Sequence, residues 1–192
     1  MRERLDWVMM TGETRKRISK FASKVLRHQP GLIGAELDAD GYMEVADLLS
    51  GMASKGMRVS REQLAKIVET NDKRRFGFSE DGEKIRAVQG HSVALEGSTV
   101  TPADPPDVLY HGTADRNVAA IFREGLIPGR RIHVHLSKDV ATATSVGSRH
   151  GRPVVLRIDA KRAAAEGVSF YLAENGVWLC DTLPPEYLST EV

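Results

Sequence analysis

The sequence lacks several features that would assign it to a class of protein at once. Its 192 residues include one cysteine, Cys180, so no disulfide can form within the chain, and we expect a cytoplasmic location. Zinc-type cysteine spacing is absent for the same reason. No apolar run approaches the roughly 20 residues of a membrane-spanning helix. Charged residues interrupt residues 1–10, where a secretory signal peptide would have an apolar core.

The chain also has little net charge, although its charges are unevenly distributed. The net charge is +1, with 41% hydrophobic and 28% charged residues, which is ordinary for a folded protein. Residues 1–88 carry 17 Lys or Arg against 14 Asp or Glu, whereas residues 89–192 carry 10 against 12. The segment 15–28 contains six Lys or Arg and no acid. This basic block indicates a polyanionic partner, and a solvated helix face is the alternative.

The basic block has the pattern of an amphipathic helix. Apolar residues recur at helical spacing and the basic residues lie on the other side, which favours a helix with one buried face. Pro30 and Gly31 are expected to end it. The apolar positions are Ile18, Phe21, Ala22, Val25 and Leu26.

The rest of the first half predicts two short helices and a hairpin. A helix is expected over 45–52, and Ser60 and Gln63 form a capping-box pattern that opens another. Strands at 75–78 and 84–88 flank a turn and make a plausible hairpin. Helices followed by a hairpin resemble a winged-helix module. Such modules often bind nucleic acid, although a fold alone does not establish function.

A change in composition separates this lobe from the second half. Glycine, proline and small polar residues are frequent in 91–107, which predicts a linker between a winged-helix-like lobe at 1–90 and a second lobe at 108–192. The second lobe alternates many short strands with few helices. We therefore expect an α+β protein with mostly antiparallel pairing in this lobe.

The most informative stretch of the second lobe is 131–137, Arg-Ile-His-Val-His-Leu-Ser. In a strand, Arg131, His133 and His135 would project from one face, and the three apolar residues between them would fill the other. Such a row of polar side chains is costly to bury without partners and indicates a polar, anionic ligand. A solvated strand face and a zinc site built from His111, His133 and His135 are the alternatives.

Eight strings of residues, in unbroken order over about 18–188, resemble the RNA 2′-phosphotransferase family, the family of the KptA-type tRNA 2′-phosphotransferase. Each string is weak by itself, but the ordered set is specific. The strings are Ser19-Lys20 to Leu26-Arg27-His28, Leu37-Asp38 to Gly41-Tyr42, Asn71-Asp72-Lys73 to Arg75-Phe76, Gln89-Gly90-His91-Ser92, Leu109-Tyr110-His111-Gly112-Thr113, Arg131 to Ser137, Val146-Gly147 to Arg149-His150-Gly151, and Asn175-Gly176-Val177-Trp178-Leu179.

The resemblance implies an NAD-dependent reaction that removes an internal 2′-phosphate from RNA, as at a tRNA splice junction. The 2′-phosphate attacks the ribose C1″ of NAD⁺ and nicotinamide leaves, which gives an ADP-ribosylated RNA 2′-phosphate. The ribose O2″ then attacks the phosphorus and releases the RNA and ADP-ribose 1″,2″-cyclic phosphate. Cationic groups that stabilise charge on the transferred phosphate are the expected main source of rate.

The family's catalytic Arg-His-Arg-Arg set falls on Arg27, His28, Arg75 and Arg131, which places the implied active site between the lobes. The arginines would clamp the phosphate with bidentate contacts, and His28 would protonate the departing RNA O2′. The position before Phe76 selects Arg75, with the adjacent Arg74 as the alternative. Taken alone, Arg27-His28 would more often be a helix end stabilised by cations.

The second lobe resembles the ADP-ribosyltransferase fold, which implies an NAD-binding lobe. The resemblance carries over His111, Gly112, Thr113, His135 and Ser137 as NAD contacts. The predicted NAD-binding set also includes His133, as a ligand contact or a supporting residue, and Gly147 and Arg149. From the residues alone, Thr113 could merely cap the following helix, and 147–151 could be a simple turn whose amides and Arg149 suit a diphosphate.

These features predict an enzyme with NAD as co-substrate, RNA bearing an internal 2′-phosphate as partner, no metal and a monomeric state. One alternative is an ADP-ribosyltransferase that acts on terminal phosphates of nucleic acids and stops at the first step. Another is a non-catalytic, NAD-sensing nucleic-acid-binding protein.

Overall fold

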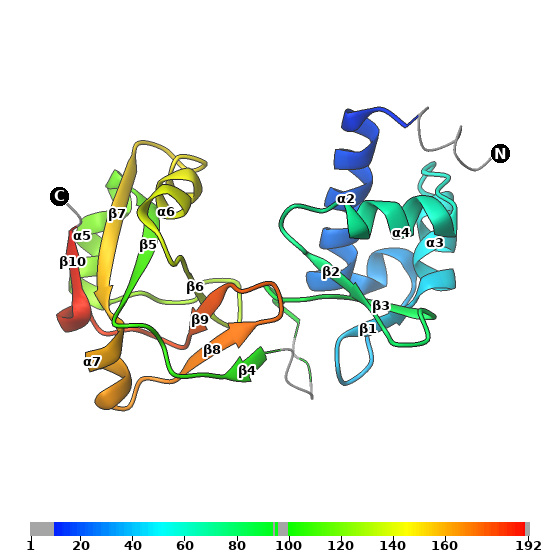
Figure 1. Ribbon diagram of the computed structural model, residues 1–192. Helices are drawn as coiled ribbons and strands as arrows, with labels where there is room; N and C mark the ends of the chain where they lie inside the picture. Colours follow the sequence, from blue (N-terminus) through cyan, green and yellow to red (C-terminus); the bar gives the residue numbers. More distant parts are fainter. Residues whose placement is uncertain (1–9, 94, 96–99, 191–192) are drawn as a thin grey trace. The chain divides into compact units, whose positions relative to one another are not determined.

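The computed structural model describes residues 10–93, 95 and 100–190. The chain forms two compact units, residues 1–99 and 100–192 (Figure 1). The boundary falls inside the predicted linker, of which residues 94 and 96–99 lie outside the described residues. Among the residues that the structure describes, no helix is both long and apolar enough to cross a membrane.

The first unit combines helices with a three-stranded antiparallel sheet in the order β1-β3-β2. Its elements in chain order are α2 (Gly12–Arg27), the 3-10 helix η1 (Pro30–Ile33), β1 (Tyr42–Glu44), α3 (Val45–Ser54), α4 (Arg61–Glu69), β2 (Phe76–Phe78) and β3 (Lys84–Ala87).

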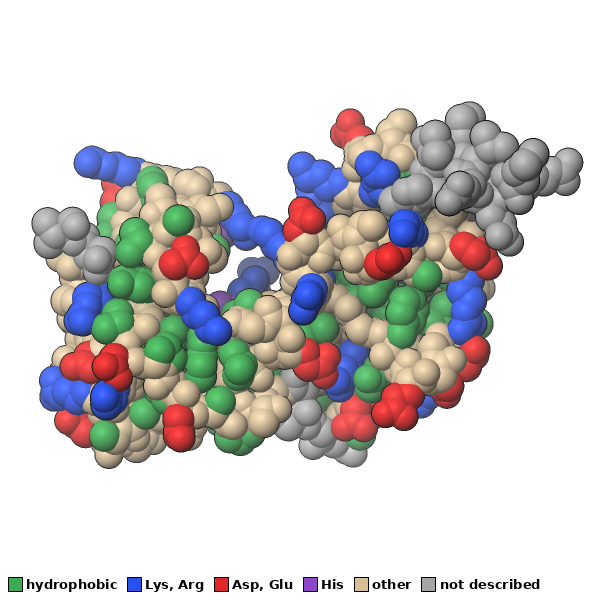
Figure 2. All heavy atoms as spheres, in the orientation of Figure 1, with side chains coloured by type: hydrophobic (Ala, Val, Ile, Leu, Met, Phe, Trp, Pro, Cys, Tyr) green, Lys and Arg blue, Asp and Glu red, His purple; other side chains and the backbone are tan. Residues whose placement is uncertain are grey.

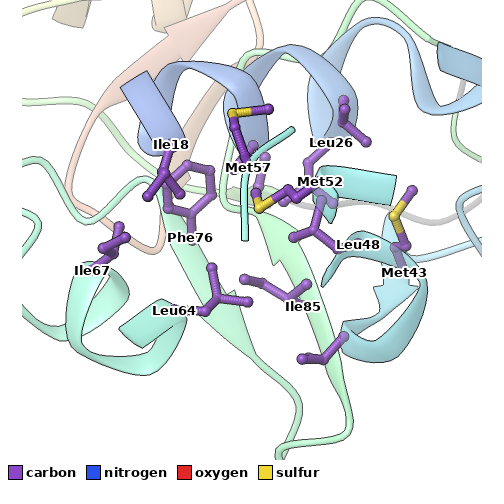
Figure 3. Close-up of a cluster of buried hydrophobic side chains, with 14 residues drawn as sticks. Ile18, Leu26, Met43, Leu48, Met52, Met57, Leu64, Ile67, Phe76 and Ile85 are labelled. Carbon is purple, nitrogen blue, oxygen red and sulfur yellow. The ribbon is translucent and has the colours of Figure 1, made fainter. Parts of the chain in front are cut away.

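Helix α2 forms as its apolar pattern predicts. Thr11 caps its first turn by accepting a hydrogen bond from the Thr14 N–H, and the predicted apolar stripe faces inward, with all of its members except Phe21 fully buried. Figure 3 shows these side chains converging with those of the other helices and the sheet on one core. The labelled core residues are Ile18, Leu26, Met43, Leu48, Met52, Met57, Leu64, Ile67, Phe76 and Ile85.

Two local predictions in this unit are confirmed. Ser60 caps α4, and the full capping box with Gln63 is present, which satisfies two otherwise unpaired N–H groups. The predicted hairpin is the antiparallel pair β2 and β3, in which Phe78 lies opposite Ile85. The helix end was also predicted, although Pro30 begins a short 3-10 helix there rather than an irregular loop.

The second unit contains two antiparallel sheets, β10-β7-β5 and β4-β8-β9-β6. A bridge between Tyr110 and Ser137 links β5 to the residue that follows β6. The elements are β4 (Val100–Pro102), β5 (Val108–Ala114), α5 (Asp115–Glu124), β6 (Val134–Leu136), α6 (Val140–Gly147), β7 (Pro153–Asp159), α7 (Ala160–Ala165), β8 (Phe170–Ala173), β9 (Trp178–Cys180), the 3-10 helix η2 (Pro185–Tyr187) and β10 (Leu188–Thr190).

The structure confirms the α+β class and the antiparallel pairing expected of the second half. The winged-helix and ADP-ribosyltransferase descriptions of the two lobes stay predictions. Two parts of the segment predicted as a linker are structured. His91 is buried in the first unit, and Val100–Pro102 pairs with β8 in the second. Composition misses this because proline and glycine are also tolerated in short edge strands and at their ends.

Candidate active site

A basic groove of about 620 Å³ lies in the first unit between α2 and the turn that follows α4. Its lining carries seven Lys or Arg side chains and, among the described residues, a single acid, Asp72. Figure 2 shows basic side chains, in blue, over the upper part of α2. The cationic lining residues are Arg15, Lys16, Lys20, Lys24, Arg27, Lys73 and Arg75, with His28 beside them.

Three of the four predicted catalytic residues, Arg27, His28 and Arg75, line this groove. Arg27 is the last residue of α2 and His28 is its C-cap. The carbonyl groups at a helix C-terminus carry partial negative charge, which favours cations there. The helix end thus lowers the cost of placing two basic groups side by side, and this stabilisation is compatible with a role in binding anions.

The turn after α4 selects Arg75 over Arg74 as the residue at the groove. Arg75 is half-buried in the lining, and its Nη1 donates to Oδ1 of Asn71 over 3.4 Å. Asn71 in turn donates to Ser19 on α2 over 3.4 Å, so it connects the turn to the helix. Arg74 is exposed and has a φ of 40°, a left-handed conformation that bulky residues rarely adopt.

The Gln89–Ser92 string is hydrogen-bonded to the C-terminal end of α2 through Ser92. The Ser92 N–H donates to the Arg27 carbonyl over 2.9 Å, and the Ser92 Oγ lies 2.9 Å from Nδ1 of His28 in a hydrogen bond. His91 is 3% exposed. Burial, and then the positive charges of Arg27, His28 and Arg86, lower the pKa of His91 to about 4. His91 is therefore neutral near pH 7.

In the second unit, a backbone carbonyl fixes the predicted NAD-contacting His111. Its Nδ1 lies 3.0 Å from the carbonyl oxygen of His135, which can only accept, so Nδ1 carries the proton. Burial lowers the pKa of His111, opposed by this hydrogen bond. A neutral imidazole with its proton on Nδ1 has an acceptor at Nε2, which suits a hydroxyl donor such as a ribose.

His135 lies within β6, and His133 lies in the bend directly before it. Val134 and Leu136, between and beyond them, are buried in the core. The His133 ring lies 4.9 Å from that of Tyr171, and its Nε2 lies 3.7 Å from Asp181 Oδ1. Desolvation lowers the pKa of His133, and the Asp181 charge opposes this. An imidazole from the bend before β6 and an aromatic ring from β8 thus lie together.

Arg131 is an exception to the predicted row. Strand β6 spans only Val134–Leu136, and Arg131 lies in the turn before it, where its N–H donates to the Pro128 carbonyl. The left-handed Gly129, with a φ of 68°, favours this turn. Strand alternation therefore does not place Arg131 beside His133. Desolvation, and then the like charge of Arg149, lower the pKa of Arg131, so two guanidinium groups from distant positions lie near each other.

Packing gives a reason for two of the predicted glycines. A Cβ on Gly112 would meet the Ala143 carbonyl oxygen at 1.7 Å, and one on Gly147 would meet the Thr113 oxygen at 2.7 Å. Helix α6 therefore lies directly against β5, with Arg149 just beyond its end. Their predicted NAD contacts stay predictions, because close helix-strand packing alone requires glycine at both positions.

The remaining predicted positions have local partners. Thr113 is buried and its Oγ1 accepts from the Asn117 side chain over 3.3 Å, so it contacts the first turns of α5. Ser137 exchanges backbone hydrogen bonds with Tyr110. Among the described residues, no three His, Cys, Asp or Glu side chains are grouped as metal ligands would be, so the zinc alternative has no ligand set there.

The structure brings the predicted residues together in two sets, one in each unit. Sequence reasoning gave no role to Ser92, His91 and Asn71 in the first unit, or to Tyr171 and Asp181 in the second. The strings around residues 71 and 89–92 were the available signal. Their partners lie many positions away, such as His28 for Ser92, and no local pattern encodes such a contact. The predicted meeting of Arg131 with Arg27 stays a prediction.

Comparison with known proteins assigns a family. A family model described as RNA 2'-phosphotransferase, Tpt1 / KptA family, matches residues 13–182. A protein of Hahella chejuensis named "Probable RNA 2'-phosphotransferase" is 54% identical over 89% of this chain and 91% of its own. Proteins of the same name from Burkholderia lata (49% identical; 90% and 89% of the two chains) and Rhodopirellula baltica (51%; 89% and 93%) are similar. The chain belongs to the Tpt1 / KptA family of RNA 2′-phosphotransferases.

Proposed function

We propose that this protein is an NAD-dependent transferase that removes an internal 2′-phosphate from RNA and releases nicotinamide and ADP-ribose 1″,2″-cyclic phosphate. The observation that carries the proposal is the groove in which Arg27, His28 and Arg75 lie together, in a chain of this family. A phosphomonoester with a nearby phosphodiester chain is the ligand that such a groove fits.

The shape and charge of the groove support RNA as its occupant. Its basic side chains follow α2 from Arg15 to Arg27, a run of just over three helical turns or about 18 Å at 1.5 Å per residue. This length spans several backbone phosphates. Cations on one helix face neutralise such phosphates without reading the bases. We therefore assign the 2′-phosphate to the Arg27 and Arg75 end and the RNA strand to the rest of the groove.

The second unit fits NAD as co-substrate. The neutral His111, with its acceptor at Nε2, suits a ribose hydroxyl. The neighbouring Arg131 and Arg149 suit negative charge, because two like charges that depress a pKa are relieved by an anion. The aromatic and imidazole face formed by His133, His135 and Tyr171 suits a flat ring such as nicotinamide. NAD⁺ supplies an electrophilic ribose C1″ whose leaving group departs as neutral nicotinamide.

In the first step, an oxygen of the RNA 2′-phosphate forms the bond to C1″ while the bond to nicotinamide breaks with its electron pair. The phosphate is already an anion at neutral pH and needs no general base. The work of Arg27 and Arg75 in this step is to hold the phosphate in line for attack. Guanidinium groups suit this because their planar fork binds two oxygens at once.

In the second step, the ribose O2″ attacks phosphorus and the RNA O2′ departs. The O2″ hydroxyl loses a proton and the departing O2′ gains one. His28 is the imidazole among the groove residues that can supply that proton. Arg27, Arg75 and Arg131 are proposed to stabilise the charge that builds on the phosphate oxygens.

The test of this function is the product profile of the purified protein with NAD⁺ and a 2′-phosphorylated oligonucleotide. We expect nicotinamide, dephosphorylated RNA and ADP-ribose 1″,2″-cyclic phosphate. A stable ADP-ribosylated phosphate end would instead identify a transferase that stops at the first step. Binding without nicotinamide release would identify a non-catalytic sensor, and both results contradict the proposal.

The His28→Ala variant tests the assignment of the second step. The first step needs no proton donor, so we expect the variant to form ADP-ribosylated RNA that then accumulates. Electrophoresis of a radiolabelled oligonucleotide separates this species from substrate and product. Normal turnover by the variant would rule out His28 as the proton donor.

A further inference from the structure

The Gln89–Ser92 string is a sequence feature that the proposed reaction does not use. It belongs to no strand or helix, and the lining of the basic groove does not include its residues. Its last residue nevertheless makes two hydrogen bonds to the Arg27-His28 pair, one from its backbone and one from its side chain. This placement indicates that Ser92 acts indirectly, by positioning Arg27 and His28.

We propose that Ser92 is the positioning residue of His28, in that its hydroxyl accepts the Nδ1–H of the His28 imidazole and makes Nε2 the nitrogen that transfers the proton. This inference rests on the proposed function, because it concerns the second step of that reaction. It goes further by assigning the proton to a ring nitrogen and by naming the residue that selects it.

The backbone contact supports this role. Arg27 is the last residue of α2, and its carbonyl is one of the four that a helix leaves unpaired at its C-terminus. The Ser92 N–H donates to this carbonyl over 2.9 Å, which fixes the position of Ser92 relative to the residue next to His28. The main chain therefore keeps Ser92 beside His28 independently of the side-chain bond.

The chemistry of the imidazole explains how one hydrogen bond at Nδ1 makes Nε2 the nitrogen that transfers the proton. The protonation of one ring nitrogen is set by the hydrogen bond that the other makes. A protonated His28 donates through Nδ1 to the Ser92 oxygen and carries its transferable proton on Nε2. After that proton leaves for RNA O2′, the Nδ1–H remains with Ser92, so the ring need not turn between the two charge states.

The neighbouring His91 is consistent with this arrangement. It is almost fully buried beside Arg27, His28 and Arg86, where a second cationic imidazole would compete with His28 for the proton. Because it stays neutral near pH 7, His91 adds no further positive charge beside His28. Burial of His91 also anchors the string directly before Ser92.

The proton assignment can be measured in the unaltered protein. Long-range ¹⁵N–¹H NMR reports which ring nitrogen of a neutral histidine carries the proton, and the His28→Ala variant identifies the His28 signal. We expect the Nδ1–H tautomer for neutral His28. The Nε2–H tautomer would overturn the proposal, whatever the protein's activity.

Kinetics with three variants tests the consequence. Ser92→Ala keeps the backbone N–H and removes the hydroxyl, so we expect the second step to slow by roughly 10- to 100-fold with accumulation of ADP-ribosylated RNA and an unchanged KM for NAD⁺. Ser92→Thr keeps the hydroxyl and should restore turnover. Ser54→Ala, which removes a hydroxyl bonded to the Gly51 carbonyl on α3, is the matched control.

The outcomes separate this inference from the function on which it rests. If wild-type protein makes no nicotinamide from NAD⁺ and 2′-phosphorylated RNA, the proposed function fails and the NMR result alone decides the positioning role. If wild-type turns over and Ser92→Ala matches it, or slows both steps equally without rescue by threonine, the positioning role is wrong.

Discussion

The two units hold their candidate functional groups in place by different kinds of contact. The first gathers cations in one groove, at the end of a helix and the turn beside it, and its key hydrogen bonds join side chains from distant positions, such as His28 and Ser92. The second carries imidazoles on a short strand and its neighbour, and their Nδ1 atoms are held by backbone carbonyls.

The difference corresponds to the two proposed ligands. A polyanion is attracted by charge, which acts over a distance and is screened by salt. A ribose or a flat ring is recognised by hydrogen bonds and contact area, which require fixed, neutral groups at short range. We expect changes in the first unit to affect the RNA phosphate, and changes in the second, apart from Arg131, to affect NAD⁺ with little effect on RNA.

The largest expected effect is that of Arg75→Ala. Loss of one preorganised cation from the phosphate site should lower kcat for 2′-phosphate transfer by roughly 10²- to 10³-fold, with a weaker dependence of RNA binding on salt. Single-turnover kinetics over a range of salt concentrations measures both. Arg74→Asn is the control, because asparagine tolerates the left-handed backbone at this exposed position. Equal losses in the two variants would refute the choice of Arg75.

The next effect concerns pH and the first unit alone. The folded-state pKa of His91, about 4, is below the ordinary value of 6.5, so between these values the unfolded state binds more protons. Stability is therefore fully present above about pH 6.5 and falls as the pH drops toward 4, by about 3 kcal/mol at 1.36 kcal/mol per unit.

Denaturant unfolding of the wild type and of His91→Leu across pH 4 to 8 checks this. In this variant the free energy of unfolding should depend much less on pH in that window. Replacement of the exposed His150 by Gln should leave the wild-type pH dependence in place. A wild-type stability that does not change between pH 6.5 and 4 would contradict the buried, neutral state of His91.

A smaller effect is expected for His111→Ala in the second unit. Loss of the fixed acceptor should raise KM for NAD⁺ by roughly 10-fold or more, the equivalent of a lost buried hydrogen bond of about 1–3 kcal/mol. The dissociation constant for 2′-phosphorylated RNA, measured by fluorescence anisotropy, should stay the same. A comparable loss of RNA affinity would contradict the assignment of RNA to the first unit and of NAD⁺ to the second.

The smallest effect is structural. In Gly112→Ala, the new methyl group would overlap the Ala143 carbonyl, and α6 would have to move from β5. We expect a loss of about 1–3 kcal/mol in the free energy of unfolding, measured by denaturant titration. Gly31→Ala, where a Cβ meets nothing within 4 Å, should stay within about 0.5 kcal/mol of wild type.

The sequence predicted those parts of the fold that depend on near neighbours. The apolar stripe of α2 and the Ser60 capping box follow from the helix period and from local capping rules. Such patterns act over a few residues and are complete in the sequence. The strand that was expected to begin at Arg131 does not begin there. The Gly129 turn determines the backbone at this point, although polar and apolar residues alternate in the sequence as in a strand.

The contacts that define the candidate site were harder to predict. The carbonyl that orients His111 is 24 positions away, and Ser92 is 64 positions from His28. The resemblance marked these residues without giving their partners. It also marked Gly112 and Gly147, and a sequence cannot tell a glycine required by packing from one that makes room for a ligand.

The bond between Ser92 and Arg27 has a consequence for the order in which the protein acquires activity. The described core of the first unit extends from α2 to Ala87, and the string that holds the Arg27-His28 pair follows it directly. A growing chain can therefore bury its first core before the pair is fixed. We expect the first unit of the nascent protein to fold before residue 92 has left the ribosome, and activity to appear only after the second unit, which carries His111 and Arg131, has followed.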